Sequence, residues 1–310
     1  MFRQKIEPFG NWERRIFENK ESGCRFSLVP EFGATVLELI FNGKNILDHY
    51  QSPEELEVGA WSKNAVLFPF PNRLKNGQYE TDGKKYQFPI NDNNTQNALH
   101  GLGHQKPFSV KHIELSSTEA KIICTYQDEG ENESYPFPFV CKISFCIKTD
   151  NEFEVELFFQ NNSQQRIPVG LGWHPYFILS EKINDCFLQM PTCQMIEVDE
   201  YMIPTGTKYD YSFFKKKKKI EKVVLDNGFK LKKENGRAAI IVEGDYGTLN
   251  YWQEVGHRLW NFVQVFTPPN RKSIAIEPMT CNIDAFNNRD GLILLESGEK
   301  IGGKFGLRLD

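Results

Sequence analysis

The chain has 310 residues, enough for one large domain or two ordinary ones, and its 40% of hydrophobic residues is enough for a packed core. The net charge of −4 gives no reason to expect nucleic acid or an anionic membrane as a partner. The seven cysteines show no CxxC or paired zinc spacing, and no apolar leader or bilayer-spanning run is present in the sequence. We therefore expect free buried thiols and a cytoplasmic protein.

Short stretches in which apolar and polar residues alternate predict β-strands along most of the chain. In chain order, the expected strands are 24–29, 36–41, 110–115, 119–126, 141–148, 152–157, 238–243, 262–266, 273–277, 292–296 and 304–309. The clearest is 152–157, where Phe153, Val155 and Leu157 would share one face and three glutamates the other. A short helix is expected at 51–58. Many strands without long helices between them predict an all-β fold, a large antiparallel β-sandwich, with residues 1–310 as one domain.

The basic run Lys215–Lys219 lies between apolar neighbours. A solvated loop or a strand edge guarded by lysines is the favoured interpretation, and a phosphate or polyanion site is the alternative.

Three segments combine residue types that carry chemistry. His174 follows a tryptophan and precedes Pro-Tyr-Phe, which suits a sugar site with aromatic walls, although a core or rim histidine is an equally good interpretation. If Glu277 shares a strand face with Ala275, burial would raise its pKa toward that of a useful base, but a strand-end glutamate in water is commoner. Arg73 could be a fixed hydrogen-bonding fork, with a surface ion pair as the commoner case.

A metal site is not expected. His100 and His104 have the spacing of two ligands on one helical face, but the glycines at 101 and 103 and Pro107 make a helix there improbable.

Taken together, these segments resemble the aldose 1-epimerase (galactose mutarotase) family. The resemblance covers about residues 25–309 and rests on four features in the family's order and approximate spacing: Asn72-Arg73, Leu99-His100-Gly101, Trp173-His174-Pro175-Tyr176-Phe177 and Glu277-Pro278. The family fold is an antiparallel β-supersandwich, in agreement with the alternation described above.

The resemblance implies roles for individual residues. Glu277 matches the general base and His174 the general acid. The residues implied to hold the sugar are Asn72, Arg73, His100 and Asp226. The match of Asp226 rests on less distinctive neighbours, and a turn aspartate before Asn-Gly is its competing interpretation. Gln264 resembles a further hydroxyl-binding position, but its flanking residues depart from the usual form, so it is not counted among the expected site residues.

The implied reaction exchanges the α and β anomers of an aldose through the open-chain aldehyde. Ring opening removes a proton from the C1 hydroxyl and adds one at the ring oxygen, which one base and one acid can do. No metal, nicotinamide or other cofactor is expected, and the expected partner is a small-molecule aldose sugar, bound by a monomer or a homodimer.

Three other functions stay open at this stage. A hexose-6-phosphate 1-epimerase would need extra cations, for which Lys75 or Lys215–Lys219 are candidates. A non-catalytic sugar-binding protein would have no need for both Glu277 and His174. A glycoside hydrolase or lyase would need a second acid facing Glu277, such as Asp226 or Asp284.

Overall fold

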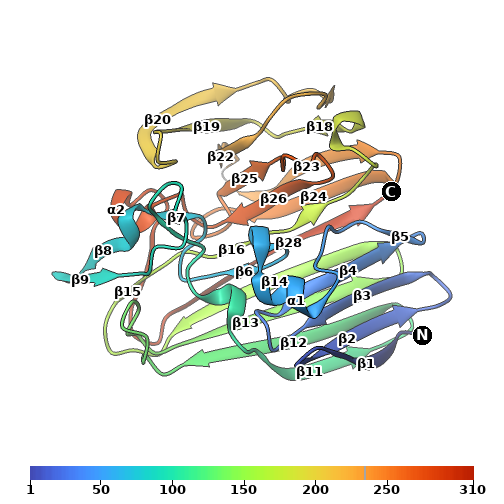
Figure 1. The fold of residues 1–310 in the computed structure, drawn as a ribbon, viewed down its shortest axis with the longest axis horizontal. Coiled ribbons are helices and arrows are strands. Elements are labelled where there is room, and N and C mark those ends of the chain that lie inside the picture. Colours follow the sequence, from blue (N-terminus) through green and yellow to red (C-terminus); the bar gives the residue numbers. More distant parts are fainter. Residues whose placement is uncertain (234) are drawn as a thin grey trace.

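The computed structural model describes residues 1–233 and 235–310. About 52% of the residues lie in strands and 7% in helices, which confirms the all-β prediction. Three large antiparallel sheets account for most of the strands (Figure 1). Within the described residues no helix is long and apolar enough to cross a bilayer.

The first sheet has five strands in chain order. These are β1 (Arg3–Phe9), β2 (Trp12–Asn19), β3 (Cys24–Val29), β4 (Thr35–Phe41) and β5 (Lys44–Asn45).

The second sheet has nine strands and forms the long layer of the molecule. Their spatial order is β11 (Ser109–Leu115), β12 (Glu119–Asp128), β13 (Phe139–Lys148), β14 (Glu152–Asn161), β28 (Lys300–Leu309), β24 (Gly247–Val255), β23 (Gly236–Gly244), β18 (Phe187–Gln189) and β21 (Lys218–Lys219).

The third sheet has eight strands and carries the site described below. Its order is β20 (Pro204–Tyr211), β19 (Cys193–Val198), β22 (Asp226–Leu231), β25 (Phe262–Phe266), β26 (Ile274–Met279), β16 (Gly172–Trp173) and β6 (Val66–Leu67), with β17 (Tyr176–Phe177) paired to β26. Short ladders join β7 (Arg73–Leu74) to β10 (Ala98–Leu99), β8 (Gln78–Thr81) to β9 (Lys84–Gln87), and β15 (Ile167–Val169) to β27 (Ile293–Leu295).

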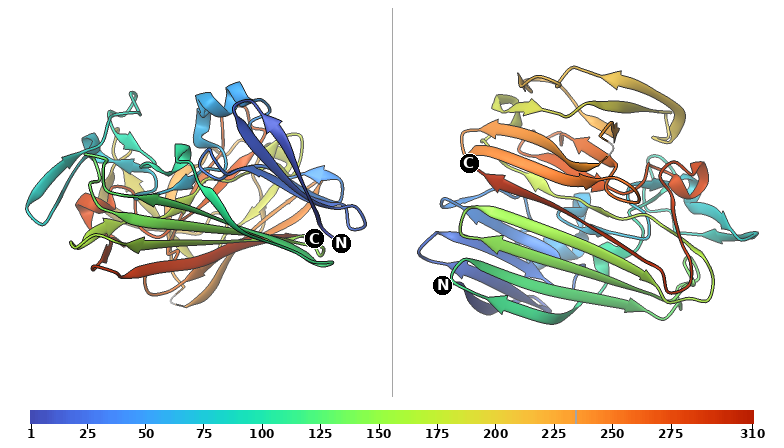
Figure 2. Two further views of the ribbon diagram at one scale, coloured as in Figure 1. Left: turned by 90° about the horizontal axis from the view of Figure 1, so that it is seen from below. Right: turned by 180° about the vertical axis from the view of Figure 1, so that it is seen from behind.

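The blue N-terminal strands lie over the green strands of the nine-stranded sheet (Figure 2), and aromatic side chains pack between the layers. The ring of Phe26 on β3 lies 5.4 Å from that of Phe153 on β14. The ring of Trp173 on β16 lies 5.5 Å from that of Phe305 on β28. The five-stranded and eight-stranded sheets therefore both pack on the nine-stranded sheet, and truncating such a buried ring typically costs about 3–5 kcal/mol.

Strands β25 and β26 use their two faces differently. Ile274 and Ile276 belong to the main core, so the alternation of a strand turns Ala275 and Glu277 to the opposite, outer face. Gln264 pairs with Glu277 across the two strands and shares that face. Ala275 and Glu277 thus share one face, and Glu277 is only 2% exposed, so it is not the strand-end glutamate in water of the commoner interpretation.

The predicted short helix is confirmed as α1 (Pro53–Val58), a second helix being α2 (Ala285–Asn288). The hydroxyl of Ser52 accepts a hydrogen bond from the backbone N–H of Glu55 at 3.3 Å and caps the start of α1. Gly59, in the left-handed conformation, ends it. The chain then continues into the short 3₁₀ turn Ala60–Ser62, which lies beside the site.

Two further expectations from the sequence are confirmed. Lys218 and Lys219 form β21 at the edge of the nine-stranded sheet, and Lys217 pairs with Glu243 at 2.7 Å. All seven cysteines are free and buried.

Candidate active site

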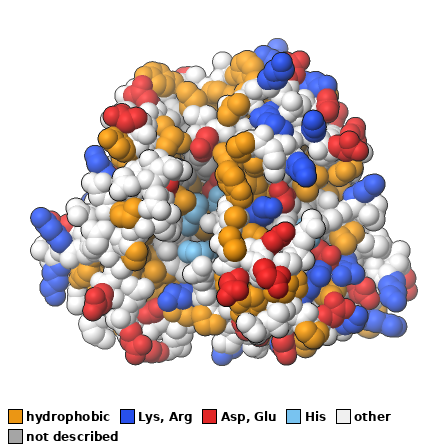
Figure 3. Space-filling model, in the orientation of Figure 1, with side chains coloured by type: hydrophobic (Ala, Val, Ile, Leu, Met, Phe, Trp, Pro, Cys, Tyr) orange, Lys and Arg blue, Asp and Glu red, His pale blue; other side chains and the backbone are white. Residues whose placement is uncertain are grey.

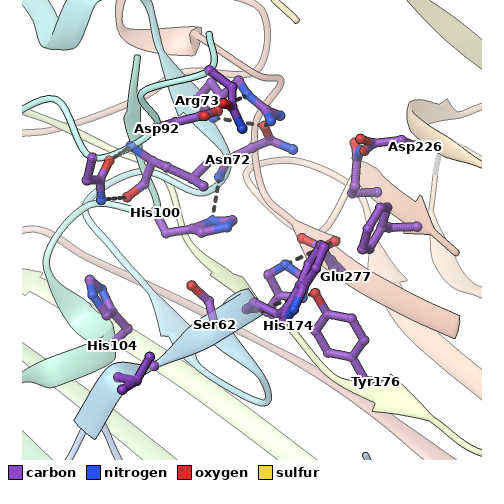
Figure 4. A pocket seen from close by; sticks show the side chains of 18 residues that line it. Ser62, Asn72, Arg73, Asp92, His100, His104, His174, Tyr176, Asp226 and Glu277 are labelled. Carbon is purple, nitrogen blue, oxygen red and sulfur yellow. Dashed lines mark hydrogen bonds and ion pairs between the residues drawn. The ribbon is translucent and has the colours of Figure 1, made fainter. Parts of the chain in front are cut away.

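A cavity of about 490 Å³ opens on the outer face of the eight-stranded sheet. In the space-filling view, histidine side chains lie in a hollow near the middle of this face (Figure 3). The residues expected from the sequence all line this cavity: Asn72, Arg73, His100, His174, Asp226 and Glu277. Segments far apart in the chain therefore meet at one place, as the close-up shows (Figure 4).

Glu277 and His174 are in direct contact at the floor of the cavity. Oε1 of Glu277 lies 3.5 Å from Nε2 of His174, and the two side chains are 2% and 7% exposed. Burial raises the pKa of Glu277 well above its usual range, and the negative charge of Asp226 raises it further. Burial also lowers the pKa of His174 to about 3. Each group taken alone is thus driven toward its neutral form, while their mutual attraction favours the ion pair.

The backbone around His174 is held on both sides by the loop before β6. The N–H of His174 donates to the carbonyl of Ala65 at 3.0 Å, and its carbonyl accepts from the N–H of Asn64 at 2.8 Å. The buried Asn64 side chain donates to the carbonyls of Val36 and Asp48 at 3.1 and 3.0 Å. The ring of Tyr176 stacks on the imidazole with 4.8 Å between centroids. The imidazole therefore has little freedom to leave Glu277.

Arg73 lies across the cavity from this pair and is held by an acidic partner. Its Nε donates to Oδ2 of Asp92 at 3.0 Å and to the hydroxyl of Thr95 at 3.4 Å. Asn72, with a left-handed backbone (φ 57°), accepts from the Arg73 side chain at 3.4 Å through Oδ1. These contacts orient the guanidinium without using all five of its N–H donors.

His100 is fixed against Asn72 in a way that sets its tautomer. Its Nδ1 accepts a hydrogen bond from the Asn72 backbone N–H at 3.3 Å, so the proton of the neutral ring lies on Nε2. Burial and the neighbouring His174 lower the pKa of His100 well below its usual range, which keeps the ring neutral. Gly101 follows in the left-handed conformation (φ 63°), where a side chain would collide with the carbonyl of Phe68. The site thus presents Nε2–H as a donor.

Asp226 and Gln264 form the remaining polar wall. Nε2 of Gln264 donates to Oδ1 of Asp226 at 2.7 Å. Burial raises the pKa of Asp226, and Arg73 together with the Gln264 hydrogen bond partly offsets this rise. Asp226 begins strand β22 opposite Phe266 and lines the cavity, so it is not the turn aspartate of the competing interpretation. Gln264, which the sequence analysis set aside, belongs to the lining as well.

Several lining residues were not among the site residues expected from the sequence. They are Val58, Gly59, Trp61, Ser62, Asn91, Asp92, Asn94, Leu99, His104, Tyr176 and Phe266. Asp92 lies in a polar loop without periodicity, and only its ion pair with Arg73 reveals its importance. Tyr176 was visible as an aromatic neighbour of His174, but the stacking of the two rings was not.

Comparison with known proteins gives the class of this fold and site. The family model for aldose 1-epimerase matches residues 20–308, and the chain therefore belongs to the aldose 1-epimerase family, a family of isomerases. The uncharacterized protein YihR of Escherichia coli (strain K12) is 30% identical over 284 residues, which is 90% of this chain and 88% of YihR.

Two further similarities agree with this assignment. Galactose mutarotase of Rattus norvegicus is 28% identical over 148 residues, covering 46% of this chain and 41% of that protein. The structure of galactose 1-epimerase from Lactobacillus acidophilus NCFM superposes with a TM-score of 0.84 at 18% identity, covering 100% of this chain and 98% of the other, which shows the shared fold. The fold expected from the sequence, a galactose mutarotase-like supersandwich, is confirmed.

Proposed function

We propose that this protein interconverts the α and β anomers of an unphosphorylated aldohexose, with Glu277 as general base and His174 as general acid. The observation that carries the proposal is the contact of 3.5 Å between these two groups at the floor of a cavity lined by hydrogen-bonding side chains. The sugar-holding roles of Asn72, Arg73, His100 and Asp226 are part of the proposal.

The proposed reaction balances with a single proton on the acid–base pair. Glu277 takes the proton of the C1 hydroxyl while the C1–O5 bond breaks and His174 gives a proton to O5. The aldehyde then rotates about the C1–C2 bond, and the reverse transfers close the ring on the other face of C1. A positioned acid or base typically contributes on the order of 10²–10⁴-fold to such a step.

The charges around the cavity favour a neutral sugar over a phosphorylated one. Among the described residues that line the cavity, Arg73 is the only lysine or arginine, and Asp92 already pairs with it. Asp226 and Glu277 add acidic groups to the same space. Neither Lys75 nor Lys215–Lys219 lies in the lining, so neither supplies the cations that a phosphate group demands.

The other two rival functions explain the site less well. A protein that only binds sugar has no use for a buried carboxyl in contact with a buried imidazole, an arrangement that costs desolvation energy. A glycoside hydrolase needs a second acid facing Glu277, and of the two candidates Asp284 lies outside the cavity lining, which leaves Asp226, held by Gln264, as the one alternative. We also propose that residues 1–310 form one domain and act in the cytoplasm, as the seven buried free thiols favour.

Polarimetry of freshly dissolved α-D-glucose and α-D-galactose, compared with the uncatalysed rate, tests the proposed function. We expect acceleration of both sugars and little effect on hexose 6-phosphates. His174→Asn should lower kcat by on the order of 10²-fold or more, whereas His112→Asn, a change on exposed strand β11, should leave it unchanged. Binding without acceleration, or a His174→Asn variant of nearly full activity, would contradict the proposal.

A further inference from the structure

His104 is a third imidazole in the cavity, and the mechanism above makes no use of it. It lies on the 3₁₀ turn Gly103–Gln105, outside the segments that carry Glu277 and His174. Its ring nitrogen Nδ1 is buried and has no hydrogen-bond partner among the described residues. His104 thus lines the cavity with a polar atom that the described residues leave unsatisfied, and such an atom calls for an explanation.

The backbone under His104 is tightly held. The N–H groups of Leu102 and Gly103 both donate to the carbonyl of Phe68, at 2.7 and 3.2 Å. Gly103 packs so closely on the carbonyl of Val66 and the ring of Phe68 that any side chain at position 103 would collide with them. The imidazole of His104 is therefore presented from a rigid support rather than from a loose loop, as binding groups require.

The polar groups of the cavity divide into two sides about the acid–base pair. Asp226 lies on the Glu277 side, where its charge acts on the Glu277 carboxyl. His100 lies on the His174 side, with 5.1 Å between ring centroids, and His104 lines the same cavity. In the close-up, His104 and the hydroxyl of Ser62 likewise lie beyond His174, away from Asp226 (Figure 4).

The connectivity of a pyranose ring matches this division. The ring runs C2–C1–O5–C5, so a sugar with its C1 hydroxyl at Glu277 and O5 at His174 places C2 on the Glu277 side and C5 on the His174 side. The substituent of C5 then faces the wall formed by His104 and Ser62. Resting on the proposed function, we infer that His104 and Ser62 form the subsite for the C5 substituent and select a neutral hydroxymethyl group.

The chemistry of this wall suits an uncharged hydroxyl. Burial lowers the pKa of His104, so the ring is neutral and offers one donor and one acceptor nitrogen. A hydroxyl can serve both His104 and the Ser62 hydroxyl, since it donates and accepts. No lysine or arginine among the described lining residues lies here to balance a phosphate or carboxylate on C6, since Arg73 pairs with Asp92.

Three sugars with the same ring hydroxyls test the subsite: D-glucose, 6-deoxy-D-glucose and D-xylose. They differ only in the substituent of C5, which is a hydroxymethyl group, a methyl group and a hydrogen atom, respectively. We expect the wild-type protein to show a kcat/KM about 2- to 12-fold higher for D-glucose than for 6-deoxy-D-glucose, the range of one neutral hydrogen bond. His104→Phe keeps the ring volume but removes both nitrogens, and it should abolish this preference, with the largest loss of rate for D-glucose and the smallest for D-xylose. His112→Phe on exposed β11 is the matched control and should keep the preference.

The outcomes separate this inference from the proposed function. If the wild-type protein accelerates none of the sugars, the proposed function fails first. If it accelerates all of them but His104→Phe lowers all three rates equally, or the preference for D-glucose persists, the subsite assignment is overturned. Should His104→Phe unfold, as its circular dichroism and thermal melting would show, Ser62→Ala provides the same comparison with a smaller expected loss of preference.

Discussion

Replacing Glu277 by glutamine should destroy activity and stabilise the fold at the same time. Glutamine keeps the size of the side chain but cannot take the C1 hydroxyl proton, so kcat should fall by on the order of 10²–10⁴-fold. The stabilisation has a separate origin. Wild-type Glu277 is 2% exposed, and its Oε2 has no hydrogen-bond partner among the described residues, so its ionised form is poorly solvated.

The sign of the stability change follows from the raised pKa of Glu277. Below the pKa of an unfolded glutamate, about 4.3, both states hold the proton and the group costs nothing. As the pH rises from there through the raised folded pKa, the unfolded state is ionised and the folded state resists ionisation, so stability is lost. The Glu277→Gln variant has no ionisable group at position 277, so its stability does not fall in this way. We expect a gain of about 1–3 kcal/mol at about pH 8, the usual cost of a buried group without a partner, and almost none at about pH 4.

Thermal melting at both pH values measures this gain, with polarimetry on the same samples. For 310 residues the unfolding entropy is about 0.65 kcal/mol/K, so 1 kcal/mol corresponds to about 1.5 °C in Tm. Because His174 contacts Glu277, the same comparison is repeated in a His174→Asn background, which removes the contribution of the imidazole. A variant that keeps a tenth of the wild-type kcat, or whose Tm advantage is the same at both pH values, would refute the reasoning.

Two further substitutions probe the groups around the acid–base pair. Asp226→Asn removes a negative charge that raises the pKa of Glu277. The acid–base pair works with a single proton, which it loses as the pH rises through this raised pKa, so the alkaline limb of the pH–rate profile should move to lower pH. A limb that stays in place or moves to higher pH would contradict this coupling. Asn64→Ala removes two hydrogen bonds that the side chain donates to buried carbonyls and the acceptor of the Tyr176 N–H. Urea denaturation should show a loss of about 2–4 kcal/mol in the free energy of unfolding. The control variant Asn93→Ala, at an exposed position, should lose almost none.

The sequence predicts strands well where one face is buried and the other is wet. Strand β14 alternates between buried and half-exposed residues along its whole length, and β25 begins and ends at the predicted residues 262 and 266. Strand β2 was missed because its buried residues Ile16 and Phe17 are adjacent and break the alternation. Strand β20 was missed because almost none of its residues is buried, which leaves no apolar face to detect.

The site was predictable to the extent that its residues lie in distinctive short segments. His174 and Glu277 stood out through their neighbours and the family resemblance, and the structure brings them into contact. Asp92 and His104 could not be found in this way, because a polar loop and a glycine-rich turn show no pattern that separates a site residue from an exposed one. Their importance depends on what lies across the cavity from them, which is information that only tertiary structure supplies.

The alternation of β26 has a consequence for how this protein can change over time. Successive residues of one strand serve different purposes, since Ile274 and Ile276 hold the layers together while Glu277, on the opposite face, lines the cavity. A substitution on one face need not disturb the other. The opposite wall of the cavity consists of loops and the short β7–β10 ladder, which lie outside the eight-stranded sheet. New substrate preferences can therefore arise by exchanging loop residues, while the scaffold and the contact between Glu277 and His174 persist.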